Sequence, residues 1–424
     1  MSRRRAPRLS AKRRVLIIVE NMPLPLGRRT WMEATALRDA GYQVSVISPV
    51  GKGCEALFEM VEGIAVYRHP RPPEGHRGLG FVREYAEALW HETRLAWRVW
   101  RERGFDVIHV CNPPDLLFLV ALPFKLLYGT RFVFDHHDVN PELYLAKFGR
   151  RDLPYYALLI AERLTFTLAD AVISTNESYR RVALGRGHKR ASDVFIVRSA
   201  PRLDRFQPRP GGERYREGFR YLVGYVGVIG SQDGLDYLMR AVRLIVDSGR
   251  TDIKFMIMGD GTALDETRRL CTSLGVDSFV EFTGMISNQE ELLERLTACD
   301  LGVAPDPKNS MNDICTMNKV IEYMALSKAM VQFDLTEGRF SAGEASLYAR
   351  PNDEADFAAK ILELLGDSER RVRMGELGSA RVRNALSWEH QIPALLATYE
   401  RALGTDRSFT LRQVEVSPKS QSQG

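Results

Sequence analysis

The feature that most constrains the fold is an alternation of short apolar runs with longer amphipathic stretches, which occurs twice along the chain. Runs such as Leu16–Val19 and Phe132–Phe134 are apolar throughout, as expected for strands that are covered on both faces. Short strands of this kind, separated by amphipathic helices, are typical of βα units on a parallel sheet. The sequence therefore predicts the α/β class.

The alternation is interrupted once, between Asp193–Arg198 and Tyr221–Val226. The intervening Ser199–Phe219 contains three prolines, two adjacent glycines and many charges, and 424 residues exceed what one core ordinarily supports. We predict two Rossmann-like doubly wound domains, one at 14–198 and one at 220–386, joined by a linker at 199–219. A helix at 387–404 is expected to cross back to the first domain.

The ends of the chain are polar. Met1–Arg14 holds seven basic residues and no acid. Since the whole chain has a net charge of +5, the remaining residues carry a net charge of −2. The bulk of the protein is therefore not expected to bind nucleic acid. We interpret 1–13 as a disordered leader that is either solvated or in contact with a membrane surface, and 405–424 as a disordered tail.

The chain contains no segment typical of secretion or of a membrane span. No apolar segment suited to a signal peptide follows the leader, and the longest apolar run, Leu116–Phe124, could at most lie on a bilayer. Five scattered cysteines without a Cys-x-x-Cys pair predict a reducing compartment and no zinc site. We expect a cytoplasmic protein, peripheral on the inner face of the membrane if the leader binds there.

Ligands of open α/β sheets bind at the carboxyl ends of strands, so the loops after each strand are informative. The loop after the first strand lacks G-x-G-x-x-G, which argues against a dinucleotide-dependent dehydrogenase. Arg28 and Arg29 in this loop are either part of an ordinary turn or contacts to an acceptor or a phosphate. The loop at 135–144 is dense in ionisable groups and predicts a site, with these acceptor-side candidates: His136, His137, Asp138 and Glu142. Metal ligation by this loop is the weaker interpretation.

The second half begins with a strand, a glycine-rich turn and a helix. Backbone N–H groups at such a turn suit the binding of a diphosphate. A second glycine turn, after the next strand, offers the same close approach to the backbone. The candidates are Gly227, Gly230, Ser231, Gln232, Gly259 and Asp260. Each turn could also be purely structural.

A long polar loop then leads into a helix that carries Asn318, Lys319 and Glu322. Lys319 and Glu322 lie three residues apart and share one face of this helix. Glu322 is either a salt-bridged structural residue or an acceptor for ligand hydroxyls, such as those of a ribose.

These residues resemble the retaining GT-B-fold glycosyltransferases of family 4. Glu322-Tyr323-Met324-Ala325 is similar to the family's E-A-M-A helix, and Asn318-Lys319 and the loop at 135–144 look like one of its branches. The resemblance runs from about Arg14 to Leu403. Two departures are present: Ile314 stands where the family has its first Glu, and Val228 and Asp233 stand where it has Arg and Lys.

The resemblance implies transfer of a hexosyl unit from a nucleoside diphosphate sugar to a glycan or polyprenyl-linked acceptor, with retention and without a metal or other cofactor. It also implies that the two domains face each other across a cleft, with the acceptor on the side of 14–198 and the donor on the side of 220–386. It assigns Glu322 to the ribose and His137 to the sugar or acceptor, and Asp313 is the candidate substitute carboxylate. We predict that Lys319, and secondarily Arg198, supply the missing positive charge at the diphosphate. The alternatives are a nucleotide-sugar epimerase and a catalytically silent partner protein.

Overall fold

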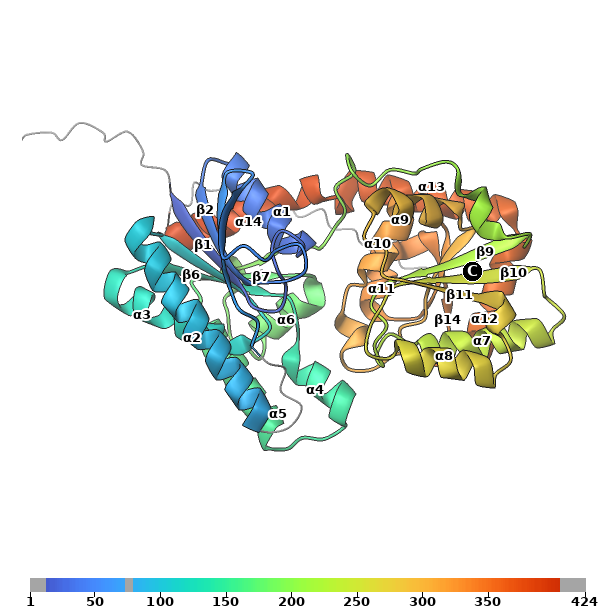
Figure 1. Cartoon of the computed structure of the whole chain (residues 1–424), viewed down its shortest axis with the longest axis horizontal. Coiled ribbons are helices and arrows are strands. Elements are labelled where there is room, and N and C mark those ends of the chain that lie inside the picture. The colour runs from blue at the N-terminus through green and yellow to red at the C-terminus, as the bar shows by residue number, and fades with distance from the viewer. Residues whose placement is uncertain (1–12, 73–78, 405–424) are drawn as a thin grey trace, which may run out of the picture.

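The computed structural model describes residues 13–72 and 79–404. The chain forms two α/β domains side by side (Figure 1), which confirms the predicted fold class. Most of the basic leader and the whole polar tail lie outside the described residues, so the leader's membrane contact stays a prediction. None of the helices within 13–72 and 79–404 is long and apolar enough to cross a membrane.

The first domain is built on an eight-stranded sheet in the order β3-β4-β2-β1-β5-β6-β7-β8. All neighbouring strands pair in parallel except β3, which pairs with β4 in an antiparallel hairpin at the edge. The strands are β1 (Arg14–Val19), β2 (Gln43–Pro49), β3 (Phe58–Val61), β4 (Ile64–His69), β5 (Val107–Cys111), β6 (Arg131–His136), β7 (Ala171–Ser174) and β8 (Val194–Ile196). The helices are α1 (Arg28–Asp39), α2 (Leu79–Glu102), α3 (Phe118–Tyr128), α4 (Asn140–Phe148), α5 (Leu153–Leu168) and α6 (Glu177–Leu184).

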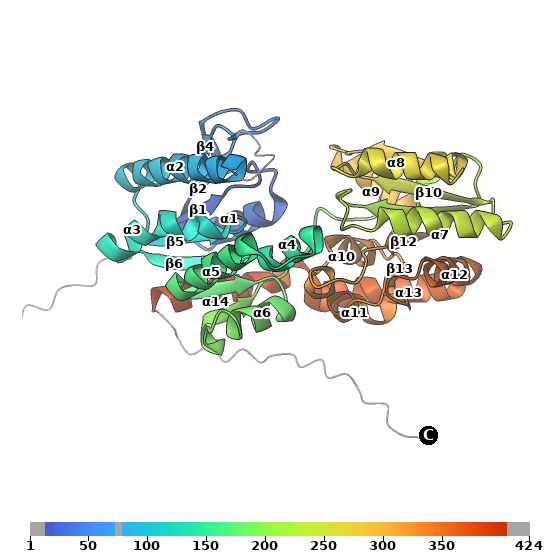
Figure 2. The ribbon, with the colours of Figure 1, turned by 90° about the horizontal axis from the view of Figure 1, so that it is seen from below.

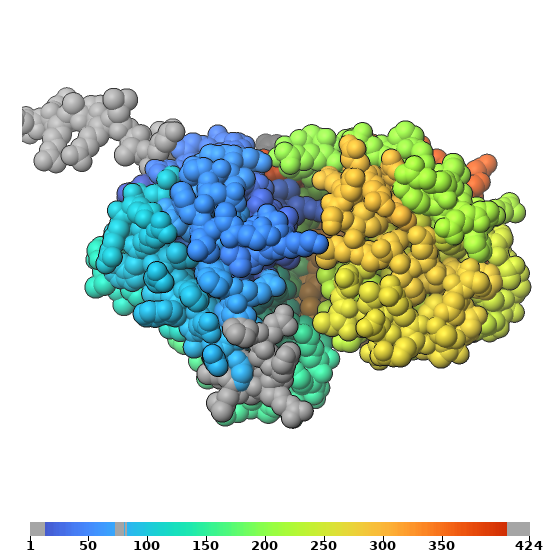
Figure 3. Space-filling view, viewed as in Figure 1, coloured from blue at the N-terminus to red at the C-terminus, as the bar shows by residue number. Residues whose placement is uncertain are grey.

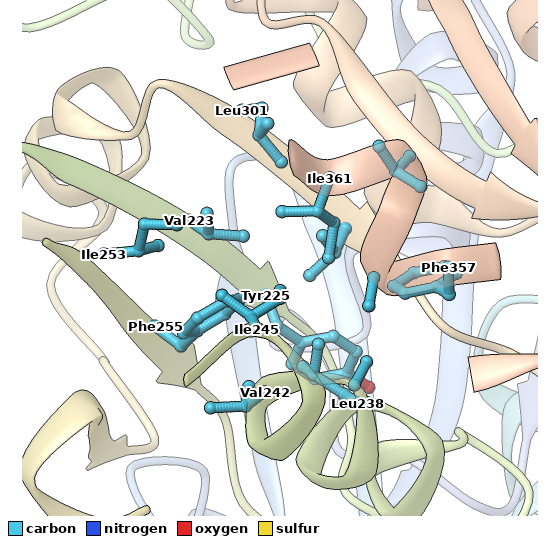
Figure 4. Packing of buried hydrophobic residues seen from close by; sticks show 14 of the residues in the cluster. Val223, Tyr225, Leu238, Val242, Ile245, Ile253, Phe255, Leu301, Phe357 and Ile361 are labelled. Atoms are coloured by element: carbon cyan, nitrogen blue, oxygen red, sulfur yellow. The ribbon is translucent and has the colours of Figure 1, made fainter. Parts of the chain in front are cut away.

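The second domain has a six-stranded parallel sheet in the order β11-β10-β9-β12-β13-β14. Its core packs β9 against α7 and α12, where Val223, Leu238 and Phe357 are fully or almost fully buried (Figure 4). The strands are β9 (Tyr221–Val226), β10 (Ile253–Met258), β11 (Val280–Gly284), β12 (Leu301–Ala304), β13 (Met330–Phe333) and β14 (Ser346–Ala349). The helices are α7 (Leu235–Asp247), α8 (Leu264–Ser273), α9 (Gln289–Ala298), α10 (Asn318–Ala325), α11 (Thr336–Ala342), α12 (Glu354–Gly366) and α13 (Ser368–Arg381).

The last helix, α14 (Trp388–Leu403), packs on the first sheet although it follows the second domain in sequence (Figure 1). The Tyr399 hydroxyl lies 2.6 Å from Nδ1 of His109 on β5, and Arg401 contacts Asp193 beside β8 at 2.7 Å. The chain therefore connects the two domains twice, through 199–219 and through the segment before α14. The first connection begins at the cleft described next, which Ser199, Ala200 and Pro201 line.

Candidate functional site

A cleft of about 590 Å³ separates the two domains (Figure 3). The first domain contributes the loop after β1 and the start of α1, and the second contributes the carboxyl ends of β9 and β10 and the first turns of α10. Its walls are largely apolar. Among the described residues, its charged side chains are Arg28, Arg29, Asp233, Asp260, Lys319 and Glu322. This is the edge of the sheets at which ligands of open α/β folds bind.

One ion pair spans the cleft. Nη1 of Arg28 at the start of α1 donates to Oε1 of Glu322 on α10 over 2.6 Å. The Glu322 side chain is only 13% exposed, whereas that of Arg28 is 58% exposed. Glu322 therefore lines the cleft, and a cation from the opposite domain contacts its carboxylate. Its role at a ribose stays a prediction.

The two glycine turns of the second domain pack directly against each other. A Cβ on Gly259 would lie 1.8 Å from the backbone oxygen of Gly227, and Gly227 has a φ of +152°. A side chain at Gly259 would therefore force the two strand ends apart, and one at Gly227 would be strained by that backbone conformation. Both glycines line the cleft, so its floor at this point is bare backbone that a ligand can approach closely. Asp260 also lines the cleft, and its carboxylate accepts from the N–H of Gly261.

The turn at 230–233 differs from the prediction. The N–H of Gly230, which we expected to bind phosphate, donates to the carboxylate of Asp233 over 2.9 Å. Burial raises the pKa of Asp233 to about 6, against the opposing effect of Lys319. Ser231 and Gln232 are not among the described residues that line the cleft, and the Gln232 carbonyl accepts from Asn312. An internal carboxylate thus occupies the anion position of this turn.

Lys319 reaches the cleft but is already paired. Its Nζ contacts both carboxylate oxygens of Asp306, at 2.6 and 2.9 Å, and both side chains are almost fully buried. The ammonium also lies 5.0 Å from the ring centre of Tyr225. Asn318, the exposed first residue of α10, lines the cleft beside it. Lys319 therefore lines the cleft with its charge largely neutralised by Asp306.

Two further predicted residues lie elsewhere. Arg198 is buried against the ring of Phe340, with Nη1 3.8 Å from Glu337, and it is not among the described lining residues of the cleft. Asp313 accepts from the N–H and the hydroxyl of Thr336, where it caps the start of α11. The structure therefore supports neither Arg198 at the diphosphate nor Asp313 as the substitute carboxylate, because each is engaged in structural contacts.

Arg29 of the first domain lines the cleft and lies at the centre of a largely buried charged cluster. The guanidinium contacts Asp135 and Glu33, both at 3.1 Å, and donates to Nε2 of His137 over 2.7 Å. His137 also lies 2.5 Å from Asp135. Burial opposes ionisation of Asp135, but Arg29 and His137 outweigh it and hold the pKa of Asp135 well below its usual range. Burial and the nearby Asp135 raise the pKa of Glu33 well above its usual range.

This cluster includes potential metal ligands. One ligand atom from each of Glu33, Cys111, Asp135 and His137 lies within 4.8 Å of the others. The loop at 135–144 alone did not predict this set, because Glu33 comes from α1 and Cys111 from β5. The i,i+4 spacing of Arg29 and Glu33 was a signal for part of it. In this arrangement, Arg29 supplies the positive charge between the two carboxylates.

The other candidates of this loop are structural. His136 is fully buried, both of its ring nitrogens lack a hydrogen-bond partner, and burial lowers its pKa to about 3. Glu142 forms a bidentate pair with Arg186 at 2.6 and 2.9 Å. The backbone of Asp138 is bonded to Asn112. Direct acceptor contacts by His136 and Glu142 are therefore not supported by their positions.

Comparisons with known proteins agree with this geometry. Residues 220–367 match the family described as glycosyl transferases group 1, and residues 26–200 match the glycosyl transferase 4-like domain. The chain is a glycosyltransferase of the GT-B type. The comparisons do not favour the epimerase or the silent partner protein.

Relatives align over most of the chain. A 2-deoxystreptamine glucosyltransferase of Streptomyces kanamyceticus is 24% identical over 88% of this chain and 97% of its own length. Sucrose-phosphate synthase from Thermosynechococcus elongatus has a similar structure, with a TM-score of 0.78 and 17% identity over 93% of this chain and 100% of its own. Anabaena HepE in complex with UDP-glucose superposes with a TM-score of 0.69 and 16% identity, over 91% and 99% of the two chains.

Proposed function

We propose that this glycosyltransferase moves a hexosyl unit from a nucleoside diphosphate sugar to a hydroxyl of a glycan or lipid-linked acceptor, with retention of configuration. The observation that carries the proposal is the position of the Glu322 carboxylate on the cleft wall, beside the bare backbone of Gly227 and Gly259. A carboxylate suits the paired hydroxyls of a ribose, and exposed backbone suits a diphosphate. The complex of HepE with UDP-glucose supports a donor of this class.

The chemistry requires stabilisation of the departing diphosphate. In this proposal Arg28 leaves Glu322 when the donor binds and moves to the diphosphate, which frees Glu322 for the ribose. Asn318 and the N-terminus of α10 add partial positive charge. From the first domain, Arg29 lines the cleft and orients the sugar or acceptor, and His137, which is not among the described lining residues, acts through its contact with Arg29.

A panel of nucleotides and sugar nucleotides tests the proposal, because a ligand that binds only the folded state raises the Tm. We expect at least one nucleoside diphosphate sugar to raise the Tm, and Glu322→Gln to reduce that shift. Glu376→Gln, an exposed substitution on α13 outside the described lining of the cleft, is the matched control. Equal shifts for wild type and Glu322→Gln would remove Glu322 from the donor site.

Retention is tested separately with the donor that the panel identifies. The anomeric configuration of the first product formed, read by proton NMR, should equal that of the donor. An inverted product would refute this part of the proposal while leaving donor binding intact.

A further inference from the structure

The outer face of the first domain exposes an unusual number of large apolar side chains. On α5 they recur as Leu153, Tyr156, Ile160 and Leu164, with the three- and four-residue spacing of a single helical stripe. Ile160 is 61% exposed. The opposite side of α5, which includes Phe166, is buried in the core. An apolar stripe that points away from the core indicates a partner that covers it.

The stripe continues onto the neighbouring helices. α3 packs against α5 on one side and against α2 on the other (Figure 2). α3 exposes Leu126 and Leu127, of which Leu126 is 72% exposed, and α2 exposes Trp90, at 67%. We call the outward-facing apolar residues of α2, α3 and α5 the outer apolar face.

Basic side chains border this face. A surface pocket on α2 is lined by Trp90, Thr93, Arg94, Trp97, Arg98 and Arg101, together with Glu102. Glu102, the acidic residue of this pocket, forms an ion pair with Arg98. On α3 and α5 the sequence contains one acidic residue, Glu162, which is fully buried against Arg186. The outer apolar face is therefore bordered by a basic edge and presents no acid from α3 or α5.

We propose that the outer apolar face docks on an anionic lipid bilayer. Apolar and aromatic side chains beside arginines are the composition of surfaces that lie in the plane of a bilayer interface, and arginines near anionic headgroups add attraction that salt weakens. A second copy of this chain fits less well, because its own arginines would face those of the first. The surface is distinct from the basic leader and does not depend on the proposed glycosyl transfer.

The experiment measures flotation of the full-length protein with vesicles of phosphatidylcholine alone and of phosphatidylcholine with phosphatidylglycerol. The double variant Leu126→Gln with Ile160→Gln keeps the charge of the chain, so the leader's contribution is unchanged. We expect it to lower the vesicle partition coefficient by on the order of tenfold. Arg94→Gln with Arg101→Gln should lower it by a similar factor at low salt and by less at high salt.

The matched control is Val372→Gln with Leu377→Gln, which removes two exposed apolar residues from α13 in the second domain. We expect this control to bind vesicles as the wild type does. Absence of binding by the wild-type chain, or an equal loss in the control, would overturn the proposal. Size-exclusion chromatography tests whether a second copy of the chain covers this face instead. A dimeric wild type and a monomeric Leu126→Gln, Ile160→Gln variant would assign the face to self-association and overturn the proposal.

Discussion

The ion pair between Arg28 and Glu322 gives a prediction whose sign depends on the mechanism. In the structure the two side chains hold each other across the cleft at 2.6 Å. In the proposed complex Arg28 contacts the diphosphate and Glu322 contacts the ribose. Donor binding then breaks the ion pair, so the attraction between the two side chains is present in the free protein and absent from the complex. The perturbations are Arg28→Ala, Glu322→Gln and the double variant.

The magnitudes follow from the contacts. A charge-assisted hydrogen bond to the donor contributes about 1.5–3 kcal/mol. The Arg28–Glu322 pair contributes about 1 kcal/mol, at the upper end for a partly exposed pair, because Arg28 is 58% exposed and Glu322 is 13% exposed. Each single variant loses its donor contact but also abolishes the competing pair, so each should weaken binding by about 0.5–2 kcal/mol. The double variant should lose about 1 kcal/mol more binding free energy than the two single variants together. Its Kd should therefore be roughly fivefold larger than additive effects would give.

Isothermal titration of the four proteins with the best-binding sugar nucleotide measures the cycle. The corresponding nucleoside, which has no phosphate, is the internal control: Arg28→Ala should not weaken its binding, while Glu322→Gln should. A double variant that loses less than the sum of the singles would refute the reasoning, because it would mean that the pair persists in the complex and acts as a unit.

Two other predictions concern the second domain. Lys319→Met should lower the free energy of unfolding in urea by about 3–5 kcal/mol, because Asp306 would be left buried without its cation. Adding Asp306→Leu should restore much of this loss. A Lys319→Met variant as stable as the wild type would contradict the importance of the pair. Because burial raises the pKa of Asp233 from 3.8 to about 6, the folded protein holds this proton more tightly than the unfolded chain, and stability should fall as the pH rises from about 4 to 6. Asp233→Asn should therefore match the wild type in free energy of unfolding near pH 4 and exceed it above pH 6 by up to about 3 kcal/mol, as measured by urea unfolding. A difference that does not vary with pH would reject this assignment.

The sequence predicted most strands because strands covered on both faces are apolar throughout. The predicted Tyr221–Val226 coincides with β9, and the apolar runs Leu16–Val19 and Phe132–Phe134 lie within β1 and β6. The β3–β4 hairpin was not predicted, because Phe58–Val61 is a partly exposed edge strand with a glutamate inside it. α4 was interpreted as part of a loop, since its first turn contains Pro141 and follows a dense polar run.

Cleft residues were predictable where local spacing decides their position. Glu322 and Lys319 share one face of a helix, and Gly227 and Gly259 each follow a strand, so both pairs reach the same edge of the sheet. Partners from distant segments were not predictable. Arg28 is 294 residues from Glu322, and Asp313, chosen because it is adjacent to Ile314, is instead used by α11.

Under the proposed function, the positions of the charges in the cleft would make donor binding depend on both domains. Val228 and Asp233 replace the two basic residues of the related pattern, Asp306 neutralises Lys319, and Asp233 occupies the N–H of Gly230. A diphosphate brings about two negative charges, of which a helix N-terminus offsets only about half of one. Among the described residues of the cleft, Arg28 is the cation that is largely exposed, and it belongs to the first domain. If the donor is the proposed nucleoside diphosphate sugar, the second domain alone lacks the exposed positive charge to hold its diphosphate firmly, and Arg28 of the first domain has to supply it. The proposal then implies that retention of the donor depends on the two domains staying together.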